Sequence, residues 1–339
     1  MRRVVIAGGR GFFGQRVAEL LGGLGVAPVI AGRAGPLELD VEDRGSLHDV
    51  LRRGDVVVDA AGPFQSRTTA LVEAACEVGA DVIDIDESLV HARRVDALAD
   101  RVRASGISVR STCSAVSTVA AALVRHSGIE RPVRVSALVA PASRETAHAG
   151  TVRALLASVG AEVDVWRDGR FITVAGWRES RAFALPPLAS LPRRRAYLVA
   201  SALPLTLPRV WPSLRAVDCW TDTSTPLANG ILALAARVPP LRAVAMRTVP
   251  LGVLLARALG ARRGAFAVEI EDSNGRIARL ALTAPRRSYL IAATPAALAG
   301  RALAAGRPSE PGIVPVHRHV DPDELLAYLR SLGIALEEG

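Results

Sequence analysis

Three glycines near the start of the chain have a spacing that suits a phosphate-linked cofactor. Gly9, Gly11 and Gly14 follow a short β-branched run and precede a helical pattern at 12–21. In G-x-G-x-x-G, the first glycine permits a tight turn, the second admits a pyrophosphate and the third lets the helix approach its strand. The motif requires a strand before it and a helix after it, and both are expected here. The sequence therefore predicts a dinucleotide site at a helix N-terminus.

Further cofactor contacts are expected at the carboxyl ends of the neighbouring strands, where parallel sheets bind ligands. Small residues after the strand expected at 55–59 permit close approach of a ligand. The expected contact residues are Gly8, Gly9, Gly11, Phe12, Phe13, Gly14, Arg33, Ala61, Gly62 and Pro63.

The choice between NADP and NAD depends on the end of the second expected strand, 26–31. An acidic residue there binds the ribose 2′-hydroxyl of NAD, whereas an arginine accommodates the 2′-phosphate of NADP. This chain has Arg33 and no acid at that point. NADP is therefore the expected cofactor, with NAD as the alternative.

Candidate proton donors follow the strands expected at 81–85 and 107–110. Asp84 and Asp86 alternate with isoleucines, so both could face one side, and Glu87 comes next at an expected helix start. Cys113 lies beyond the fifth strand. We select Cys113, Asp86 and Glu87 as candidate catalytic residues; the alternatives are packing for the cysteine and helix capping for the acids.

Other polar residues are weaker candidates. His317 and His319 are two residues apart on an extended segment, and without a third ligand a surface position is preferred to a metal site. His148 is a further possible donor. The pairs Arg144–Glu145 and Trp220–Asp222 could line a cleft in a second domain, although ordinary structural roles are preferred.

The composition excludes several chemistries. The chain has no lysine, which rules out a Tyr-x-x-x-Lys pair and any Schiff-base mechanism. The three cysteines Cys76, Cys113 and Cys219 are widely spaced and indicate neither disulfides nor zinc. Hydride transfer remains as the expected chemistry. An already protonated imine needs no proton donor from the protein, whereas a ketone or enoyl group needs one.

The net charge of +9 comes from arginine alone. It is interpreted as a compositional bias, and no nucleic-acid partner is expected; the run at 193–195 is interpreted as a solvated turn.

The N-terminus has no signal-peptide core, so a cytoplasmic location is expected. Arginines interrupt the apolar stretch 228–259, so no transmembrane segment is expected. Burial of this stretch in a homodimer or against a substrate is favoured.

The elements that position these residues form two expected domains. Helices at 46–53 (N-cap Ser46), 67–78 and 88–104 alternate with the strands, which predicts a Rossmann-type, doubly wound parallel sheet of the α/β class at 1–115. Hairpins at 163–174 and 266–283 predict an α+β domain with an antiparallel sheet at 116–305, for substrate and dimerisation. The segment 306–339, whose last helix begins at Asp321, is expected to return to the first domain.

Over about residues 1 to 125, the chain resembles the saccharopine dehydrogenase-like family. The resemblance rests on the glycine loop, Ala31-Gly32-Arg33, the Ala-Ala-Gly-Pro-Phe stretch at 60–64 and the segment 71–87. The resemblance implies an NAD(P)-binding domain, a small-molecule substrate under a mixed second domain, and often a dimer. It implies that Arg33 contacts the adenosine ribose and that Ala61, Gly62 and Pro63 lie beside the nicotinamide ribose. Members of this family that form amino acids have a Gly-x-Asp-Pro-Gly motif after the fifth strand. This chain has Ser-Thr-Cys-Ser-Ala there, at residues 111–115.

The expected function is therefore NAD(P)-dependent hydride transfer to or from an imine, keto or enoyl substrate. Two alternatives remain. The chain could be a non-catalytic NADP-binding sensor or scaffold, or a membrane-peripheral or trans-acting reductase of lipid chains, which the apolar helices at 228–259 and the resemblance would allow.

Overall fold

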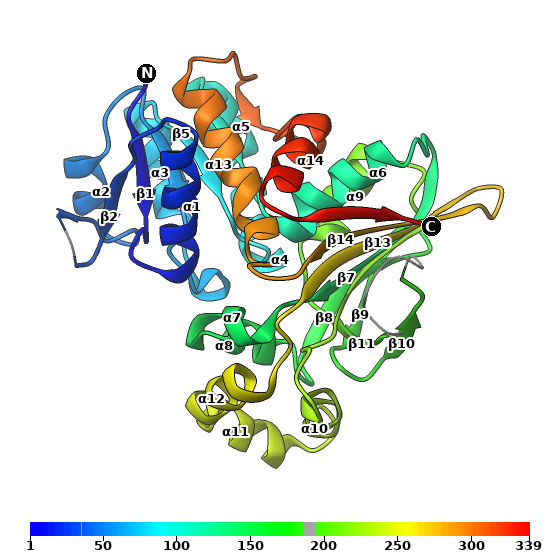
Figure 1. Ribbon diagram of the computed structural model, residues 1–339. Coiled ribbons are helices and arrows are strands. Elements are labelled where there is room, and N and C mark those ends of the chain that lie inside the picture. Colours follow the sequence, from blue (N-terminus) through cyan, green and yellow to red (C-terminus); the bar gives the residue numbers. More distant parts are fainter. Residues whose placement is uncertain (35, 186–193) are drawn as a thin grey trace. The chain divides into compact units, whose positions relative to one another are not determined.

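A computed structural model describes residues 1–34, 36–185 and 194–339 (Figure 1). The chain divides into two compact units. The first unit comprises 1–119 and 292–321, and the second comprises 120–291 and 322–339. Each unit contains its own sheet.

The first unit has a parallel sheet with the order β3-β2-β1-β4-β5-β6-β15. Its strands are β1 (Val4–Ala7), β2 (Val29–Gly32), β3 (Leu37–Glu38), β4 (Val56–Asp59), β5 (Asp81–Asp84), β6 (Ser108–Arg110) and β15 (Gly312–Ile313). This order, with its reversal between β1 and β4, is that of dinucleotide-binding sheets, which hold their ligand at the reversal. The five expected strands are present, and two short edge strands join them. The α/β fold class is confirmed.

Both faces of this sheet are buried, which explains its continuous apolar strands. On one face, Val5, Val57 and Val82 belong to a core cluster that also contains residues of α2, α3 and α5. On the other face, Gly300 of α13 lies close to Leu21 of α1 and Val58 of β4. The helices that cover the sheet are α1 (Phe12–Gly23), α2 (Arg44–Val50), α3 (Ala70–Val78), α4 (Leu89–Asp96), α5 (Ala99–Ser105) and α13 (Leu290–Ala304) (Figure 1).

Two details of these helices differ from expectation. The N-cap of α2 is Asp43 and not Ser46. The Asp43 side chain accepts a hydrogen bond from the Gly45 amide, and Ser46 Oγ accepts one from the Asp40 amide. The single helix expected at 88–104 is two helices, α4 and α5. The expected N-cap Ser88 is confirmed at the start of α4.

The second unit has a mixed sheet with the path β10-β11-β12-β7-β13-β14-β16, and β8 joins β12 and β9 beside it. Its strands are β7 (Pro132–Ala140), β8 (Glu162–Arg167), β9 (Arg170–Ala175), β10 (Ser180–Phe183), β11 (Arg194–Val199), β12 (Ala216–Thr221), β13 (Gly264–Asp272), β14 (Ile277–Ala284) and β16 (Ala335–Glu338). Both expected hairpins, β8–β9 and β13–β14, are antiparallel. However, β12 and β7 are parallel, so the sheet is not purely antiparallel as expected.

The helices of this unit are α6 (Ala120–His126), α7 (Ser143–Thr146), α8 (Ala149–Ala157), α9 (Leu203–Val210), α10 (Ala228–Ala235), α11 (Pro239–Arg247), α12 (Val249–Leu259) and α14 (Pro322–Ser331). Arg194 and Arg195 begin strand β11, which corrects the expected solvated turn; position 193 lies outside the described residues. Arg194 is held there by an ion pair with Asp222 (Nη1 to Oδ2, 2.7 Å).

The end of the chain also differs from expectation. Helix α14 and strand β16 belong to the second unit, whereas the sequence suggested that the segment 306–339 returns to the first. The reason is pairing and burial: β16 pairs with β14, and Leu325 and Leu329 of α14 are buried. Only the stretch up to Asp321, with strand β15, lies in the first unit.

Candidate functional site

The glycine loop between β1 and α1 is built so closely that side chains are excluded. Gly8 has a φ of +68°, and a Cβ added there would lie 2.7 Å from Ala61 Cα. A Cβ on Gly9 would lie 2.9 Å from Ile30 Cγ2, and one on Gly14 would lie 2.3 Å from the Gly8 carbonyl oxygen. Real Cβ contacts are not this short, so these three positions require glycine. The loop therefore lies tightly between β2, the end of β4 and its own helix.

The N-terminus of α1 is open to an anion. Its N-cap is Gly11, which supplies no side-chain cap, and the first turn contains no acidic residue. The amide of Gly11 itself bonds to the Gly8 carbonyl at 2.8 Å, which fixes the turn. Phe12 and Phe13 are half-buried and meet edge to face, with ring centroids 5.1 Å apart. Unsatisfied amides and the helix dipole favour a phosphate group at such a position.

The turn after β4 is held next to this loop by a buried ion pair. Arg67 is paired with Asp59 (Nη2 to Oδ2, 3.2 Å) and with Glu42, and its Nη1 donates to the Ala61 carbonyl at 2.6 Å. Asp59 Oδ1 also accepts from the Ala61 amide at 2.9 Å. Burial lowers the pKa of Arg67, but the charges of Asp59 and Glu42 outweigh this and raise it. Arg67 therefore remains charged and positions Ala61 ahead of Gly62 and Pro63.

Two arginines lie near the end of β2, one directly after it and one in the glycine loop. Arg33 is exposed, and the described part of the chain offers it no carboxylate partner. Arg10 lies within the glycine loop and donates through Nη1 to the Ala34 carbonyl at 3.4 Å, so it lies next to the segment that follows Arg33. Sequence reasoning missed Arg10, although its place between Gly9 and Gly11 pointed to the same ligand.

A cluster of buried carboxyl groups follows β5. Asp84 Oδ1 accepts from the amides of Thr112 (2.8 Å) and Asp86 (3.1 Å). Burial and the nearby charge of Asp59 raise the pKa of Asp84 to about 7 despite the bond from Thr112. Burial and the charge of Asp84 raise the pKa of Asp86 well above its usual value. Two adjacent buried carboxyls cannot both ionise at little cost, so this pair retains a proton.

Glu87 is half-buried beside these groups. Its Oε1 accepts from the Ser117 amide at 3.0 Å and its Oε2 from Ser117 Oγ at 2.8 Å. Burial nevertheless raises the pKa of Glu87 to about 8. Glu87 is therefore protonated near neutral pH and has the acidity of a general acid. Asp86 serves differently: its Oδ1 accepts from the Ser88 amide at 2.7 Å, while its buried Oδ2 has no partner in the described structure.

Cys113 lies in the same region but is completely buried, and burial raises the pKa of its thiol to about 12. Its amide donates to the Asp84 carbonyl at 2.8 Å. A neutral, enclosed thiol packs as a small apolar side chain.

The histidines are placed differently from expectation. His319 is buried rather than on the surface: its Nε2 bonds to the Val314 carbonyl at 2.9 Å and its Nδ1 to Thr118 Oγ1 at 2.8 Å, and burial lowers its pKa to about 3. His317 is half-buried. In the part of the chain that the structure describes, no cluster of residues could hold a metal ion. His148 belongs to the second unit, where it contacts Arg257 (Nδ1 to Nη2, 2.9 Å).

His91 is a polar residue at this edge that sequence reasoning missed. It lies on α4, is 2% exposed, and packs against Phe64 with ring centroids 5.5 Å apart. Its buried Nδ1 has no hydrogen-bond partner among the described residues, and burial lowers its pKa. Its position on a helix face gave no sequence indication of a site.

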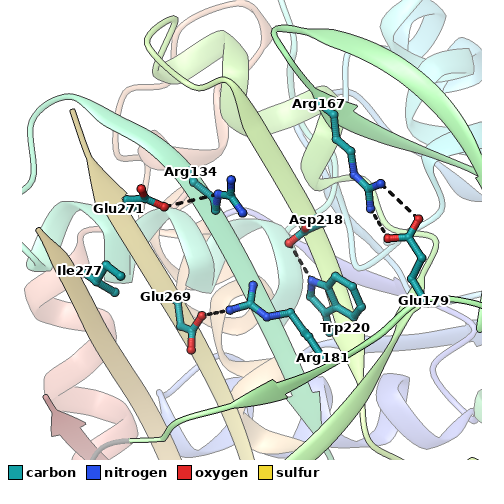
Figure 2. A pocket seen from close by; sticks show the side chains of 9 residues that line it. All are labelled: Arg134, Arg167, Glu179, Arg181, Asp218, Trp220, Glu269, Glu271 and Ile277. Carbon is teal, nitrogen blue, oxygen red and sulfur yellow. Dashed lines mark hydrogen bonds and ion pairs between the residues drawn. The ribbon is translucent and has the colours of Figure 1, made fainter. Parts of the chain in front are cut away.

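The second unit has a polar pocket of about 320 Å³ on its sheet (Figure 2). Its charged side chains neutralise one another: Arg181 pairs with Glu269, Arg167 with Glu179 (2.5 Å) and Arg134 with Glu271 (3.4 Å). Trp220 Nε1 donates to Asp218 at 2.7 Å. The pocket thus contains one of the expected cleft residues, Trp220. Its paired charges are better suited to holding strands together than to binding an ion.

The other expected cleft residues have structural contacts. Asp222 pairs with Arg194, Arg144 Nε donates to the Gly260 carbonyl at 2.7 Å, and Glu145 Oε2 accepts from the Arg287 amide at 2.5 Å. Among the described helices, none is long and apolar enough to cross a bilayer.

Comparison with known proteins gives a domain match and a shared fold. The family model for the saccharopine dehydrogenase NADP binding domain matches residues 25–110. A search of curated proteins gave no match. Apo saccharopine dehydrogenase (L-Glu forming) from Saccharomyces cerevisiae is similar over 100% of this chain and 99% of its own, with a TM-score of 0.63 and 15% identity, which shows a shared fold.

Two further structures are more distant. An engineered D-amino acid dehydrogenase bound to NADP⁺ covers 97% of this chain and 98% of its own, with 14% identity and a TM-score of 0.43. UDP-N-acetylglucosamine 3-dehydrogenase from Acidithiobacillus ferrooxidans covers 97% and 95%, with 14% identity and a TM-score of 0.40. The domain match and the fold shared with the yeast enzyme confirm the expected resemblance to the saccharopine dehydrogenase-like family.

Proposed function

We propose that this protein is an NADP-dependent oxidoreductase that transfers a hydride to or from a small imine, keto or enoyl substrate. The observation that carries the proposal is the uncapped N-terminus of α1, which Gly8 and Gly14 place at the strand reversal between β1 and β4. When bound, the nicotinamide supplies the hydride. The residues of the chain bind it, orient it and handle the proton.

The loop fits a dinucleotide because it is made of glycines at the positions where a side chain would clash, so a ligand can approach its backbone closely. Gly9 and Gly11 would leave room for the pyrophosphate, because they have no side chains, and their own amides are already bonded to the Ala31 and Gly8 carbonyls. The first turn of α1, which begins with Phe12 and Phe13, would face the phosphates. Arg33 would bind the 2′-phosphate of NADP, because a guanidinium can give two parallel charge-assisted hydrogen bonds. Arg10 would add a second positive charge. Ala61, Gly62 and Pro63 would lie along the nicotinamide ribose.

Glu87 is the proposed proton donor. Its raised pKa of about 8 keeps a proton available at neutral pH, and Ser117 holds both of its carboxyl oxygens in place. The pair of Asp84 and Asp86 would store a second proton beside it. Cys113 is the least suited of the three candidates, because its thiol is enclosed and holds its proton up to about pH 12.

Turnover of NADPH against panels of imines, keto acids and enoyl thioesters tests this proposal. We expect consumption with at least one panel, and a Glu87→Gln variant should lose more activity with keto or enoyl substrates than with preformed imines. Tight NADPH binding with no turnover in any panel would favour a non-catalytic sensor or scaffold instead. A symmetric dimer stays a prediction, which light scattering checks.

A further inference from the structure

Helices α10, α11 and α12 expose an unusual amount of apolar surface. Of the fifteen large hydrophobic side chains that are exposed in the described structure, eleven lie between Leu227 and Leu259. Leu227 is 83% exposed, Leu254 is 63% exposed and Ile231 is 61% exposed. Isolated exposed leucines are ordinary, but a contiguous group of this kind marks an interaction surface. We call these three helices the α10–α12 face (Figure 1).

The exposed side chains form stripes at helical spacing. Leu227, Ile231, Leu234 and Val238 run along and beyond α10 at intervals of four, three and four residues. Residues 251, 254, 255 and 259, all leucines, form a second stripe along α12. Such stripes normally face a protein core. Here the largest apolar side chains point outward.

Helices α10 and α12 also have residues that are buried in the unit. Ala233 and Ala235 of α10 are buried, and so is Val249 at the start of α12. Arg257 of α12 is tied to the unit through Nε, which donates to the Ala147 carbonyl at 2.9 Å. Helices α10 and α12 are therefore anchored by these residues, and the leucine stripes are left without a partner within the described unit.

The charges around this face have one sign. No acidic residue occurs between Asp222 and Glu269, whereas six arginines do: Arg237, Arg242, Arg247, Arg257, Arg262 and Arg263. Five of the six are exposed and Arg242 is half-exposed. No carboxylate in the described structure pairs with Arg242, Arg247, Arg262 or Arg263. The face thus combines an apolar surface with uncompensated positive charge.

This charge decides between two occupants. A second copy in a symmetric dimer would bring the same patch onto itself, so the arginines of both copies would gather in one interface whose patch has no acid to offset them. An anionic lipid surface meets both requirements, since acyl chains accept the leucines and headgroup phosphates accept the guanidiniums.

We propose that the α10–α12 face docks this protein on an anionic phospholipid membrane. The helices have 8, 9 and 11 residues, so they are too short to span a bilayer, and they would lie in its interface. The leucine stripes enter the boundary between headgroups and acyl chains, and the arginines remain at headgroup level. This inference does not depend on the identity of the cofactor or substrate.

Vesicle sedimentation tests the proposal. The full chain is spun with vesicles of phosphatidylcholine alone and with vesicles of equal parts phosphatidylcholine and phosphatidylglycerol. We expect binding to the anionic vesicles that weakens as salt rises, and little binding to the neutral ones. Leu254→Glu combined with Leu255→Glu should abolish it. Arg242→Gln combined with Arg247→Gln should weaken it by roughly fivefold for each arginine removed.

Matched controls are available in the same unit. Ile277→Glu introduces the same charge at an exposed apolar position outside the face, and Arg170→Gln with Arg276→Gln removes two exposed arginines elsewhere. Both controls should bind vesicles like the wild type. Thermal melts of every variant establish that it is folded, which is expected because all the altered side chains lie at the surface.

Three results would overturn the proposal. One is a wild-type protein that stays in the supernatant with anionic vesicles. Another is equal binding by the leucine variant and the Ile277→Glu control, which would place the contact on another surface. The last is a dimer in light scattering that the leucine variant converts to monomer while no vesicle binding occurs, which would make a second copy the occupant.

Discussion

The Gly8 carbonyl oxygen lies where a side chain on Gly14 would begin: a Cβ on Gly14 would come within 2.3 Å of it. The first turn of α1 therefore rests directly on the backbone of the loop that precedes it. This contact brings the open amides of the helix to the carboxyl end of β1, at the reversal of strand order. The cofactor proposal follows from it.

Gly14→Ala should destabilise the first unit and weaken NADPH binding. Loop and helix would have to separate to admit a methyl group, at an expected cost of about 1 to 3 kcal/mol. Gly22→Ala on the same helix is the control, because no atom lies within 4 Å of its added Cβ, and it should be neutral or stabilising. Urea unfolding compares the two. Equal free energies of unfolding for the two variants would mean that the contact between Gly14 and the Gly8 carbonyl does not affect stability.

Arg33→Ala should weaken NADPH binding while leaving NADH binding nearly unchanged. Loss of a charge-assisted contact with the 2′-phosphate costs roughly 1.5 to 3 kcal/mol, or about 10- to 150-fold in affinity. Arg10→Ala should act in the same direction with a smaller effect. Calorimetry with both cofactors measures the selectivity, with exposed Arg52→Ala as control. Equal losses for NADPH and NADH, or a wild type that prefers NADH, would show that Arg33 is an ordinary surface arginine.

Arg67→Met should destabilise the protein strongly. The Arg67 and Asp59 side chains are only 6% and 4% exposed, so removing the cation leaves a buried carboxylate unpaired, at a cost of about 3 to 5 kcal/mol. Arg103→Met, which breaks an exposed pair with Asp100, should leave the free energy of unfolding nearly unchanged. Denaturant titration of both variants makes the comparison. Similar, small changes in the free energy of unfolding for both variants would show that the buried Arg67–Asp59 pair does not stabilise the turn at Ala61.

Glu87→Gln should flatten the pH dependence of stability. The pKa of Glu87 is raised to about 8 in the folded state from an ordinary value of 4.5, so the folded protein holds a proton that the unfolded chain has released. The free energy of unfolding should therefore be highest below about pH 4.5 for this group and fall between pH 4.5 and 8, by at most about 1.4 kcal/mol per pH unit. Unfolding measured across this range would show the same slope in both proteins if Glu87 titrated normally.

Local signals explain which features the sequence predicted correctly. The glycine loop, the five central strands of the first sheet and both hairpins depend on short-range patterns: β-branched runs, glycine spacing, and Asp168-Gly169 and Asn274-Gly275 turns. Strands β10, β11 and β12 were missed, because their apolar residues are interrupted by arginine and polar positions that the sheet pairs across strands. Arg181, for example, meets Glu269 of β13, which is distant in the sequence.

The site itself was predictable only in part. Spacing selected candidates around Gly9 and Asp86, but it gave no sign of the burial that raises the pKa values of Asp84 and Glu87. The burial of His319 likewise depends on Thr118 and Val314, and the bond to Thr118 joins positions that are 201 residues apart. Apolar spacing at 228–259 predicted helices but could not tell which side would face outward.

NADPH binding by Gly11→Val tests the central claim most directly. Gly11 caps α1 with φ −69° and ψ 166°, a conformation that valine can adopt, so the branched side chain would stand at the helix N-terminus where the pyrophosphate is proposed to bind. Gly23→Val, at an exposed position on the same helix with no atom near its Cβ, is the matched control. In calorimetry we predict wild-type affinity for Gly23→Val and loss of NADPH binding for folded Gly11→Val. Wild-type NADPH affinity in Gly11→Val would contradict the account.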